Sequence, residues 1–532
     1  MKRRDLPGMP TQNLIEEEIE PLMSRPDGTG QDRIGRNVLT SWMSHAVFVV
    51  FGFVMPRVVD EKLGQELLGV WDFGWSIVSY LGLAMVGIGS SVNRYVARYR
   101  ASGNDVELSE TVSSVLALQV LIASAVAVAT LLLAIFLPDL LSDKLGPHAD
   151  VAGIMLLFLG WALAVQMAFD VYRGILTGCH EWSAYNALNA RGYAASATAM
   201  LSVLLLGGGL PGMAITYFIF TCGIEVLRRR LALKSCPNVS FRLAHVNGGD
   251  MRKVFRFGLK TILIFLPRII AQQTIMLLVV VKLGPAMLAV LARPIALVVH
   301  VVTLVNKFGY VLTPTAGSLQ GARRDEELRS FSIHAMRAGW ILSMLPLTFL
   351  LVLGDRVVEL WMGNGYADHA LIAILAAGSI LPAAQSATLN IMAGLNQHGK
   401  IAKVNLYVST LLVLIGFGIV SATGWTLTAA AWLIVLPSNF GLGVVATVVS
   451  CRVLHISPME YLGGVIRDPL VLGLACGTAL WLVRTYGPTA PAVSLLIGAA
   501  CQAAIAAFLL RKDLKAVYAH LYKKVDEIRP TS

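Results

Sequence analysis

"KLGQELLGV" occupies residues 62–70, and a similar stretch, "KLGPAMLAV", occupies residues 282–290. Lysine, leucine and glycine open both stretches, and a leucine and a valine follow at matching positions, each pair separated by 220 residues. Each stretch lies between two apolar runs, and its glycine suits a tight turn into a helix. A repeated turn of this kind indicates that the chain contains two copies of one structural unit.

The similarity between the two copies continues beyond these turns. "GNDVEL" (103–108) and "RRDEEL" (323–328) share an aspartate and a leucine at the same separation. Farther along, Gly178 and Gly394 match at a separation of 216 residues. Two blocks of matches with one small change in spacing are typical of an old duplication.

The composition is that of a membrane protein. Of the 532 residues, 56% are hydrophobic and only 14% are charged, and the mean hydropathy is +0.68, whereas soluble domains carry about 25% charged residues. The sequence holds about fourteen apolar stretches of the length that a helix needs to cross a bilayer. We therefore predict an all-α, polytopic membrane protein with about fourteen transmembrane helices.

Charge predicts how these helices are oriented. Lys and Arg gather in alternate loops, and cytoplasmic loops are the ones enriched in these residues, so we expect both termini in the cytoplasm. The net charge of +11 is spread over short loops near lipid headgroups, which argues against a nucleic-acid partner. The polar N-terminal stretch, with "EEEIE", does not resemble a signal peptide.

The duplication predicts two parallel six-helix repeats, because each unit has an even number of helices. In such an arrangement a substrate pathway forms between two lobes. The predicted parts are a disordered cytoplasmic tail (1–36), an N-lobe (37–228), a basic cytoplasmic connector (229–256), a C-lobe (257–450), two extra helices (451–510) and a second cytoplasmic tail (511–532).

Common catalytic and metal motifs are missing from the sequence. There is no HExxH and no P-loop, and the external loops are too short to hold a catalytic centre. The six cysteines fall in helices or cytoplasmic loops without metal-ligand spacing. We therefore expect neither an enzyme nor a metal site, with no cofactor, while coupling to protons or sodium stays open.

Three basic side chains lie seven residues apart in the apolar segment near residue 298. They are Arg293, His300 and Lys307, and two helical turns separate each from the next, so they lie near one helix face over about 21 Å. Charged side chains within a membrane usually face a protein interior or an aqueous cavity. The alternative is that Arg293 and Lys307 reach opposite membrane surfaces while His300 lies in a packed interior.

The segment "FLPRIIAQQT" (265–274) places a further cation within the membrane. Arg268 lies near its middle, and Gln272 follows one turn later on the same face. Pro267 predicts a kink where backbone carbonyls are freed. Arg268 is therefore a candidate substrate-binding residue, or else a structural residue bonded to those carbonyls.

Acidic and hydroxyl residues form a polar face on the segment that follows the first turn. Asp72, Ser76 and Ser79 lie at i, i+4 and i+7. Alignment of the two turns places Asp72 next to Arg293, so the two can pair, or Asp72 can instead cap its helix near the external surface.

Arg191 and Asp170 form a second candidate pair. Both are predicted toward the cytoplasmic side, on neighbouring helices. For them we favour an interhelical salt bridge with no role in transport.

Several motifs resemble a known family. "YLGLAMVGIGSSVNRYVARYRASGND" (80–105), "VLTPTAGSLQGARRDEELRSF" (311–331), "GLNQHGKIAKVN" (394–405) and the two turns are similar to the polysaccharide-exporter branch of the multidrug/oligosaccharidyl-lipid/polysaccharide superfamily, the lipid-linked oligosaccharide flippases. The resemblance covers about residues 37 to 450. It implies a V-shaped two-lobe bundle whose central cavity is lined by helices 1, 2, 7 and 8, and this favours the cationic stripe.

The resemblance and the charges together predict a flippase. We expect transport of a polyprenyl-pyrophosphate-linked oligosaccharide from the cytoplasmic to the external leaflet of the inner membrane, through a cavity formed by Arg268, Gln272, Arg293, His300, Lys307, Asp72 and Ser76. A polysaccharide polymerase or glycosyltransferase is an expected partner. The alternatives are a cation-coupled multidrug exporter of the same superfamily and a membrane-embedded glycan ligase or polymerase.

Overall fold

The computed structural model describes residues 34–85 and 88–511, and every regular element within them is helical. The first lobe contains α2 (Ile34–Leu63), α3 (Gln65–Gly82), η2 (Leu83–Met85), α4 (Ile88–Ser102), α5 (Asp105–Leu140), α6 (Ser142–Leu145), η3 (Gly146–His148), α7 (Ala149–Gly178), α8 (Trp182–Leu205) and α9 (Gly209–Ser235). The predicted terminal tails lie almost wholly outside the described residues.

The second lobe follows a connector that includes η4 (Leu243–His245). It contains α10 (Gly248–Leu283), α11 (Pro285–Gly321), α12 (Asp325–Met362), η5 (Asn364–Tyr366), α13 (His369–Gly394), α14 (His398–Thr423), α15 (Leu427–Ser438), a π-helical segment η6 (Asn439–Val444) and α16 (Val445–Val453). The remaining elements are α17 (Pro458–Tyr461), a second π-helical segment η7 (Leu462–Ile466), α18 (Arg467–Tyr486) and α19 (Pro491–Leu509).

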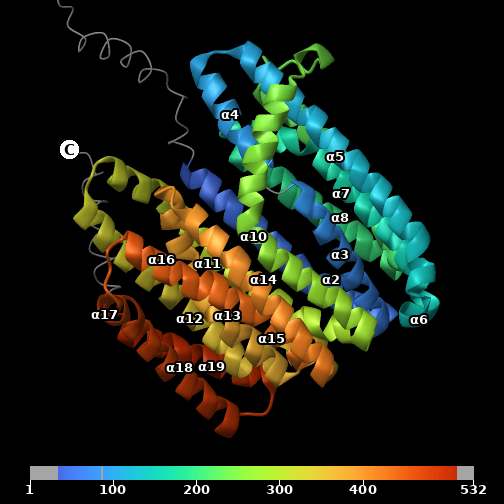
Figure 1. The fold of residues 1–532 in the computed structure, drawn as a ribbon. Helices are drawn as coiled ribbons and strands as arrows, with labels where there is room; N and C mark the ends of the chain where they lie inside the picture. The colour runs from blue at the N-terminus through green and yellow to red at the C-terminus, as the bar shows by residue number, and fades with distance from the viewer. Residues whose placement is uncertain (1–33, 86–87, 512–532) are drawn as a thin grey trace, which may run out of the picture.

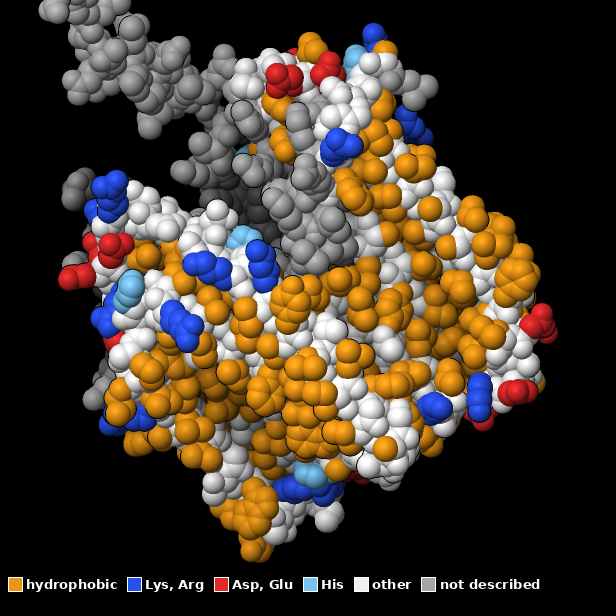
Figure 2. Space-filling model, viewed as in Figure 1, with side chains coloured by type: hydrophobic (Ala, Val, Ile, Leu, Met, Phe, Trp, Pro, Cys, Tyr) orange, Lys and Arg blue, Asp and Glu red, His pale blue; other side chains and the backbone are white. Residues whose placement is uncertain are grey.

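Among the described residues, thirteen helical stretches are long and apolar enough to cross a membrane. The fourteenth predicted segment corresponds to α8, which is 24 residues long and is less apolar because it contains Arg191 and two asparagines. It packs between α2 and α9. Figure 2 shows hydrophobic side chains over a broad band of the visible face, with charged side chains mostly toward its margins.

The duplication is visible in the backbone of the two lobes. Gly64 is the N-cap residue of α3, with φ 85° and ψ 169°, and Gly284 is the N-cap residue of α11, with φ 93° and ψ 167°. The next turn of each lobe also matches, because Asp105 and Asp325 are the first residues of α5 and α12. Matching geometry at matching positions confirms the parallel repeat inferred from the sequence.

The two turn glycines give a stability prediction. Their backbone angles belong to a region that only glycine adopts readily, so Gly64→Ala or Gly284→Ala should destabilise the protein by about 1–3 kcal/mol. Thermal unfolding in detergent measures this. The control is Gly418→Ala, at an open position within α14, where alanine should be neutral or stabilising. Equal melting temperatures for all three variants would contradict the assignment.

The two lobes meet through α3, which packs on α10 and α11. At Gly69 of α3 a Cβ atom would lie 1.8 Å from the Pro285 carbonyl oxygen of α11, so no larger residue fits without moving the lobes apart. Gln65 Nε2 also donates to the Ala286 carbonyl at 3.3 Å. In Figure 1 the lobes diverge from this end toward the end where α4 and α17 lie. The result is the V-shaped bundle that was expected.

The last two membrane helices pack beside the second lobe. Both α18 and α19 contact α12. Arg484 of α18 binds Asp355 of α12 through two hydrogen bonds, of 2.6 and 2.8 Å. This bidentate pair fixes the extra helices on the outside of the repeat, away from α2 and α3.

Candidate substrate site

An ion pair joins the two lobes beneath the repeated turns. Arg293 Nη2 of α11 donates to both carboxylate oxygens of Asp72 of α3, at 2.6 and 2.5 Å. The two side chains are only 4% and 13% exposed. The structure therefore contains the pair that the alignment of the turns suggested, and Asp72 does not serve as a free helix cap.

Arg293 and Ser76 lie at the packed interface between the lobes. Ser76 is buried, and its hydroxyl donates to the Asp72 carbonyl of its own helix at 2.9 Å. Met276 of α10 packs beside that hydroxyl. Asp72, Ser76 and Arg293 therefore lie where α3 packs against the second lobe, and none of them lines either of the two cavities described below.

The other two members of the basic stripe also face the first lobe. The His300 ring stacks on Phe53 of α2 with centroids 5.9 Å apart and makes an edge contact with His45 at 6.2 Å. Lys307 Nζ donates to the Ser41 carbonyl of α2 at 3.3 Å. The stripe therefore runs along the junction of α11 with α2 and α3, and the three side chains do share one helix face.

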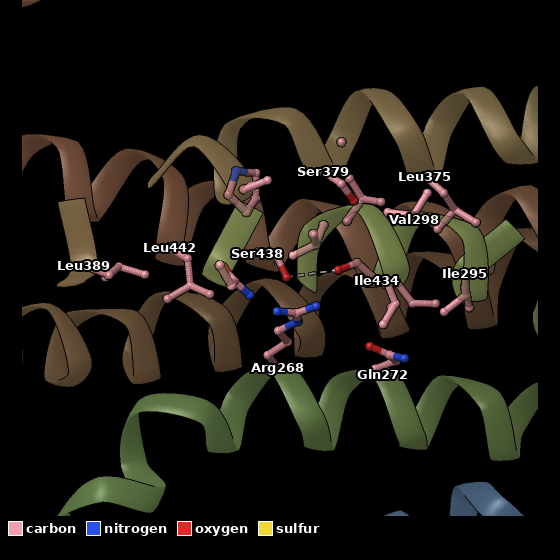
Figure 3. A pocket seen from close by; sticks show the side chains of 17 residues that line it. Arg268, Gln272, Ile295, Val298, Leu375, Ser379, Leu389, Ile434, Ser438 and Leu442 are labelled. Carbon is pink, nitrogen blue, oxygen red and sulfur yellow. Dashed lines mark hydrogen bonds between the residues drawn. The ribbon is translucent and has the colours of Figure 1, made fainter. Parts of the chain in front are cut away.

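A cavity of about 130 Å³ lies within the second lobe, among α10, α11, α13, α15 and η6. Arg268 and Gln272 of α10 both line it, and Figure 3 shows their side chains extending from α10 toward Ser438 and Ile434. Most of the remaining wall is apolar, with Asn306, Ser379 and Ser438 as the other polar residues. Within the described part of the chain, no carboxylate pairs with Arg268. The cavity therefore presents one uncompensated guanidinium in apolar surroundings.

The cavity wall includes an irregular segment of the twelfth span. The π-helical η6 follows Pro437, and Asn439 Nδ2 donates to the Gly378 and Val435 carbonyls at 2.5 and 3.0 Å. Short π segments often occur at functional sites. Here the segment carries Leu442 into the cavity wall beside Ser438.

The first lobe holds a larger cavity, of about 340 Å³, that the sequence analysis missed. Its walls come from α2, α7, α8 and α9 and include two ion pairs. Arg228 Nη1 binds Glu225 at 2.5 Å, and its Nη2 binds Asn189 Oδ1 at 2.8 Å. The sequence feature that could have revealed this cavity is a glutamate inside the apolar run "YFIFTCGIEVL" (217–227). It lies three residues before an arginine that looked like an ordinary basic residue of a loop.

The predicted salt bridge between Arg191 and Asp170 is wrong. Asp170 instead forms a bidentate pair with Arg173 of its own helix, at 2.6 and 3.0 Å. Arg191 is exposed on α8. An i,i+3 partner is available without any helix rotation, so the local pair prevails over the interhelical one.

Comparisons with known proteins agree with this architecture. The MatE family model matches residues 41–193. A Salmonella typhi protein named "Putative O-antigen transporter" is 24% identical over 224 residues, which cover 40% of this chain and 48% of that protein. The chain thus matches about half the length of this curated relative.

Three solved structures illustrate the similarity of fold. Lipid II flippase MurJ in an inward closed conformation has a TM-score of 0.67 at 11% identity, covering 90% of this chain and 99% of that one. An inward-facing multidrug resistance MATE family transporter of the MOP superfamily has a TM-score of 0.63 at 15% identity, covering 76% and 94%. A MOP superfamily transporter from Pyrococcus furiosus has a TM-score of 0.57 at 16% identity, covering 82% and 97%.

The fold and the family match define a class. The chain is a multi-pass membrane protein whose fold is similar to those of a solved multidrug transporter and a solved lipid II flippase. Residues 41–193 match the MatE family model, and the chain is similar in sequence to an O-antigen transporter and in fold to a lipid II flippase, as the resemblance of its motifs to the polysaccharide-exporter branch of the superfamily led us to expect.

Proposed function

We propose that this chain moves a polyprenyl-pyrophosphate-linked oligosaccharide from the cytoplasmic to the external leaflet of the inner membrane. Both termini would lie in the cytoplasm. The observation that carries the proposal is the uncompensated Arg268 guanidinium in a cavity of the second lobe. Arg268 is half-buried, and a cation that no carboxylate of the described residues neutralises is costly within a membrane, so an anionic ligand in the cavity would offset that cost.

A pyrophosphate suits this site chemically. The guanidinium stays charged in surroundings of low dielectric and can donate two parallel hydrogen bonds to phosphate oxygens. Gln272 lies one turn away and adds an amide donor. The apolar remainder of the wall would exclude water and strengthen the attraction.

The two-lobed architecture suits movement across the membrane. The lobes meet at the end that holds the repeated turns and diverge toward the other end (Figure 1), and charge predicts that the diverging end is cytoplasmic. Rocking of one lobe against the other would expose the cavities alternately.

The membrane potential can supply energy for this transport. A membrane potential that is negative inside favours outward movement of negative charge by about 2.3 kcal/mol per charge per 100 mV, and a proton or sodium gradient is a further source of energy. A glycosyltransferase that supplies the lipid, or a polymerase that receives it, is the expected partner.

The rival proposal is export of cationic drugs, since several proteins of similar fold are multidrug transporters. A cationic ligand needs an excess of negative charge. The first-lobe cavity does contain Asp170 and Glu225, but each is neutralised by an arginine. The second-lobe cavity is cationic, so the charges favour an anionic substrate.

The test is the sidedness of polyprenyl-linked glycan in cells that lack this protein. We expect the glycan to accumulate on the cytoplasmic leaflet and to clear when the wild-type gene is restored. Accessibility to an impermeant sugar oxidant in right-side-out and inverted vesicles measures this. If no glycan accumulates and the cells become sensitive to cationic drugs, the multidrug proposal replaces this one.

A further inference from the structure

The first-lobe cavity has a chemistry different from that of the second-lobe cavity. We propose that it is a sugar subsite, which takes part of the oligosaccharide while the second lobe holds the pyrophosphate. This inference rests on the proposed function and assigns the two ends of the substrate to opposite lobes. The cavity volume of about 340 Å³ falls within the range of small-ligand pockets, about 300–1,000 Å³.

The balance of charge in this cavity favours a neutral ligand over an ionic one. The charged residues of the cavity wall are Asp170, Arg173, Glu225 and Arg228, and they form two closed pairs, Arg173 with Asp170 and Arg228 with Glu225. The charges of the two pairs cancel, so the cavity wall offers no net charge to hold an anion or a cation. A neutral polar ligand can bind to both signs at once.

The other wall residues supply hydrogen-bonding groups of both kinds. Two amides, Gln166 and Asn189, and three tyrosines, Tyr185, Tyr193 and Tyr217, line the same space. Sugar hydroxyls both donate and accept, so they require carboxylate or carbonyl oxygens beside N–H and O–H donors. Aromatic rings with a polar tip also suit the apolar face of a sugar ring.

Some buried polar atoms of this wall lack partners. Glu225 has a side chain only 2% exposed, and its Oε2 has no hydrogen-bond partner among the described residues, as is also true of Arg228 Nε. Unsatisfied buried polar atoms are costly, and both atoms belong to residues that line the cavity. A small rotation of either side chain would let a ligand hydroxyl supply the missing hydrogen bond.

Rigid neighbours hold the wall in place. Gln166 Nε2 donates to the Tyr217 hydroxyl at 3.0 Å, and the Tyr193 ring packs on Phe48 of α2 with centroids 4.2 Å apart. Arg228 lies over the Tyr185 ring at 5.6 Å. Side chains fixed in this way lose little conformational entropy when a ligand binds.

The test measures binding of two probes to the full chain in lipid nanodiscs. One probe is polyprenyl pyrophosphate that carries the cell's own oligosaccharide, and the other is the same lipid without sugar. We expect Tyr193→Phe and Gln166→Leu each to weaken binding of the glycan-bearing lipid about tenfold, the effect of about one lost hydrogen bond, and to leave binding of the sugar-free lipid unchanged. Both substitutions spare the ion pairs and nearly conserve volume.

Two further variants separate the possible outcomes. Tyr407→Phe, at an exposed site on α14, is the matched control and should bind both probes as the wild type does. Arg268→Gln should weaken binding of both. If only Arg268→Gln has an effect, the sugar subsite is wrong and the proposed function stands; if the wild type binds neither lipid, both proposals are overturned.

Discussion

Replacement of Arg268 by glutamine is expected to abolish export of the lipid-linked glycan while the protein still folds. A bidentate pair with phosphate joins two charge-assisted hydrogen bonds, so its loss should reduce transport at least about a hundredfold. Folding should survive because Arg268 pairs with no carboxylate of the described residues, and its removal leaves no orphaned charge. Export in the deletion strain and the amount of protein in the membrane are the two measurements.

Lysine at the same position distinguishes charge from geometry. Arg268→Lys keeps the positive charge but loses the planar fork, so we expect partial export, between those of the wild type and the glutamine variant. Arg452→Gln, at an exposed position of α16, is the matched control and should export normally. Wild-type export by Arg268→Gln would remove this residue from the mechanism.

The second large effect is expected at the ion pair between the lobes. Asp72→Ala leaves the Arg293 charge buried and unpaired, which typically costs about 3–5 kcal/mol. The melting temperature should fall steeply, and Arg293→Ala should behave in the same way. The effect should be large because the arginine is 4% exposed and its carboxylate partner 13% exposed.

A double substitution tests whether the loss comes from the orphaned charge. Asp72→Leu combined with Arg293→Met removes both charges, and apolar replacements of buried ion pairs are often neutral or stabilising, so stability should return. Glu61→Ala, which breaks the exposed pair with Arg57 near the same end, should cost less than about 1 kcal/mol. A wild-type melting temperature for Asp72→Ala would show that the pair does not hold the lobes together.

Much of the fold was accessible from the sequence because its signals are local. Apolar length identifies a span wherever it packs, and thirteen of the fourteen predicted spans correspond to helices of the described residues that are long and apolar enough to cross a membrane. The glycines of the two "KLG" turns have backbone angles that few other residues adopt. Because the same glycine recurs in both copies, the sequence indicated that the backbone geometry of the turn is repeated. Arg268 and Gln272 were found because an arginine within an apolar run is conspicuous.

The rest of the candidate site depends on which helix faces lie opposite each other. Spacing placed Arg293, His300 and Lys307 on one face, but could not say whether that face met water, lipid or the other lobe. Glu225 escaped notice because its partner, Arg228, looked like one of several cytoplasmic basic residues. Asp170 was assigned to Arg191 on a neighbouring helix, although Arg173 lies three residues away on its own helix. The separation of two residues in the sequence does not by itself show which of several possible charged partners a side chain will bind.

By itself, then, the sequence determined the membrane class, the number of spans and the duplicated plan, because hydropathy and turn chemistry act within a few residues. Only the tertiary structure decided that Asp72 pairs with Arg293, that Arg268 lines a cavity whose described wall contains no carboxylate, and that Glu225 and Arg228 line a second cavity in the other lobe. Each of these depends on the rotation and packing of whole helices, which are set by contacts between residues far apart in the chain.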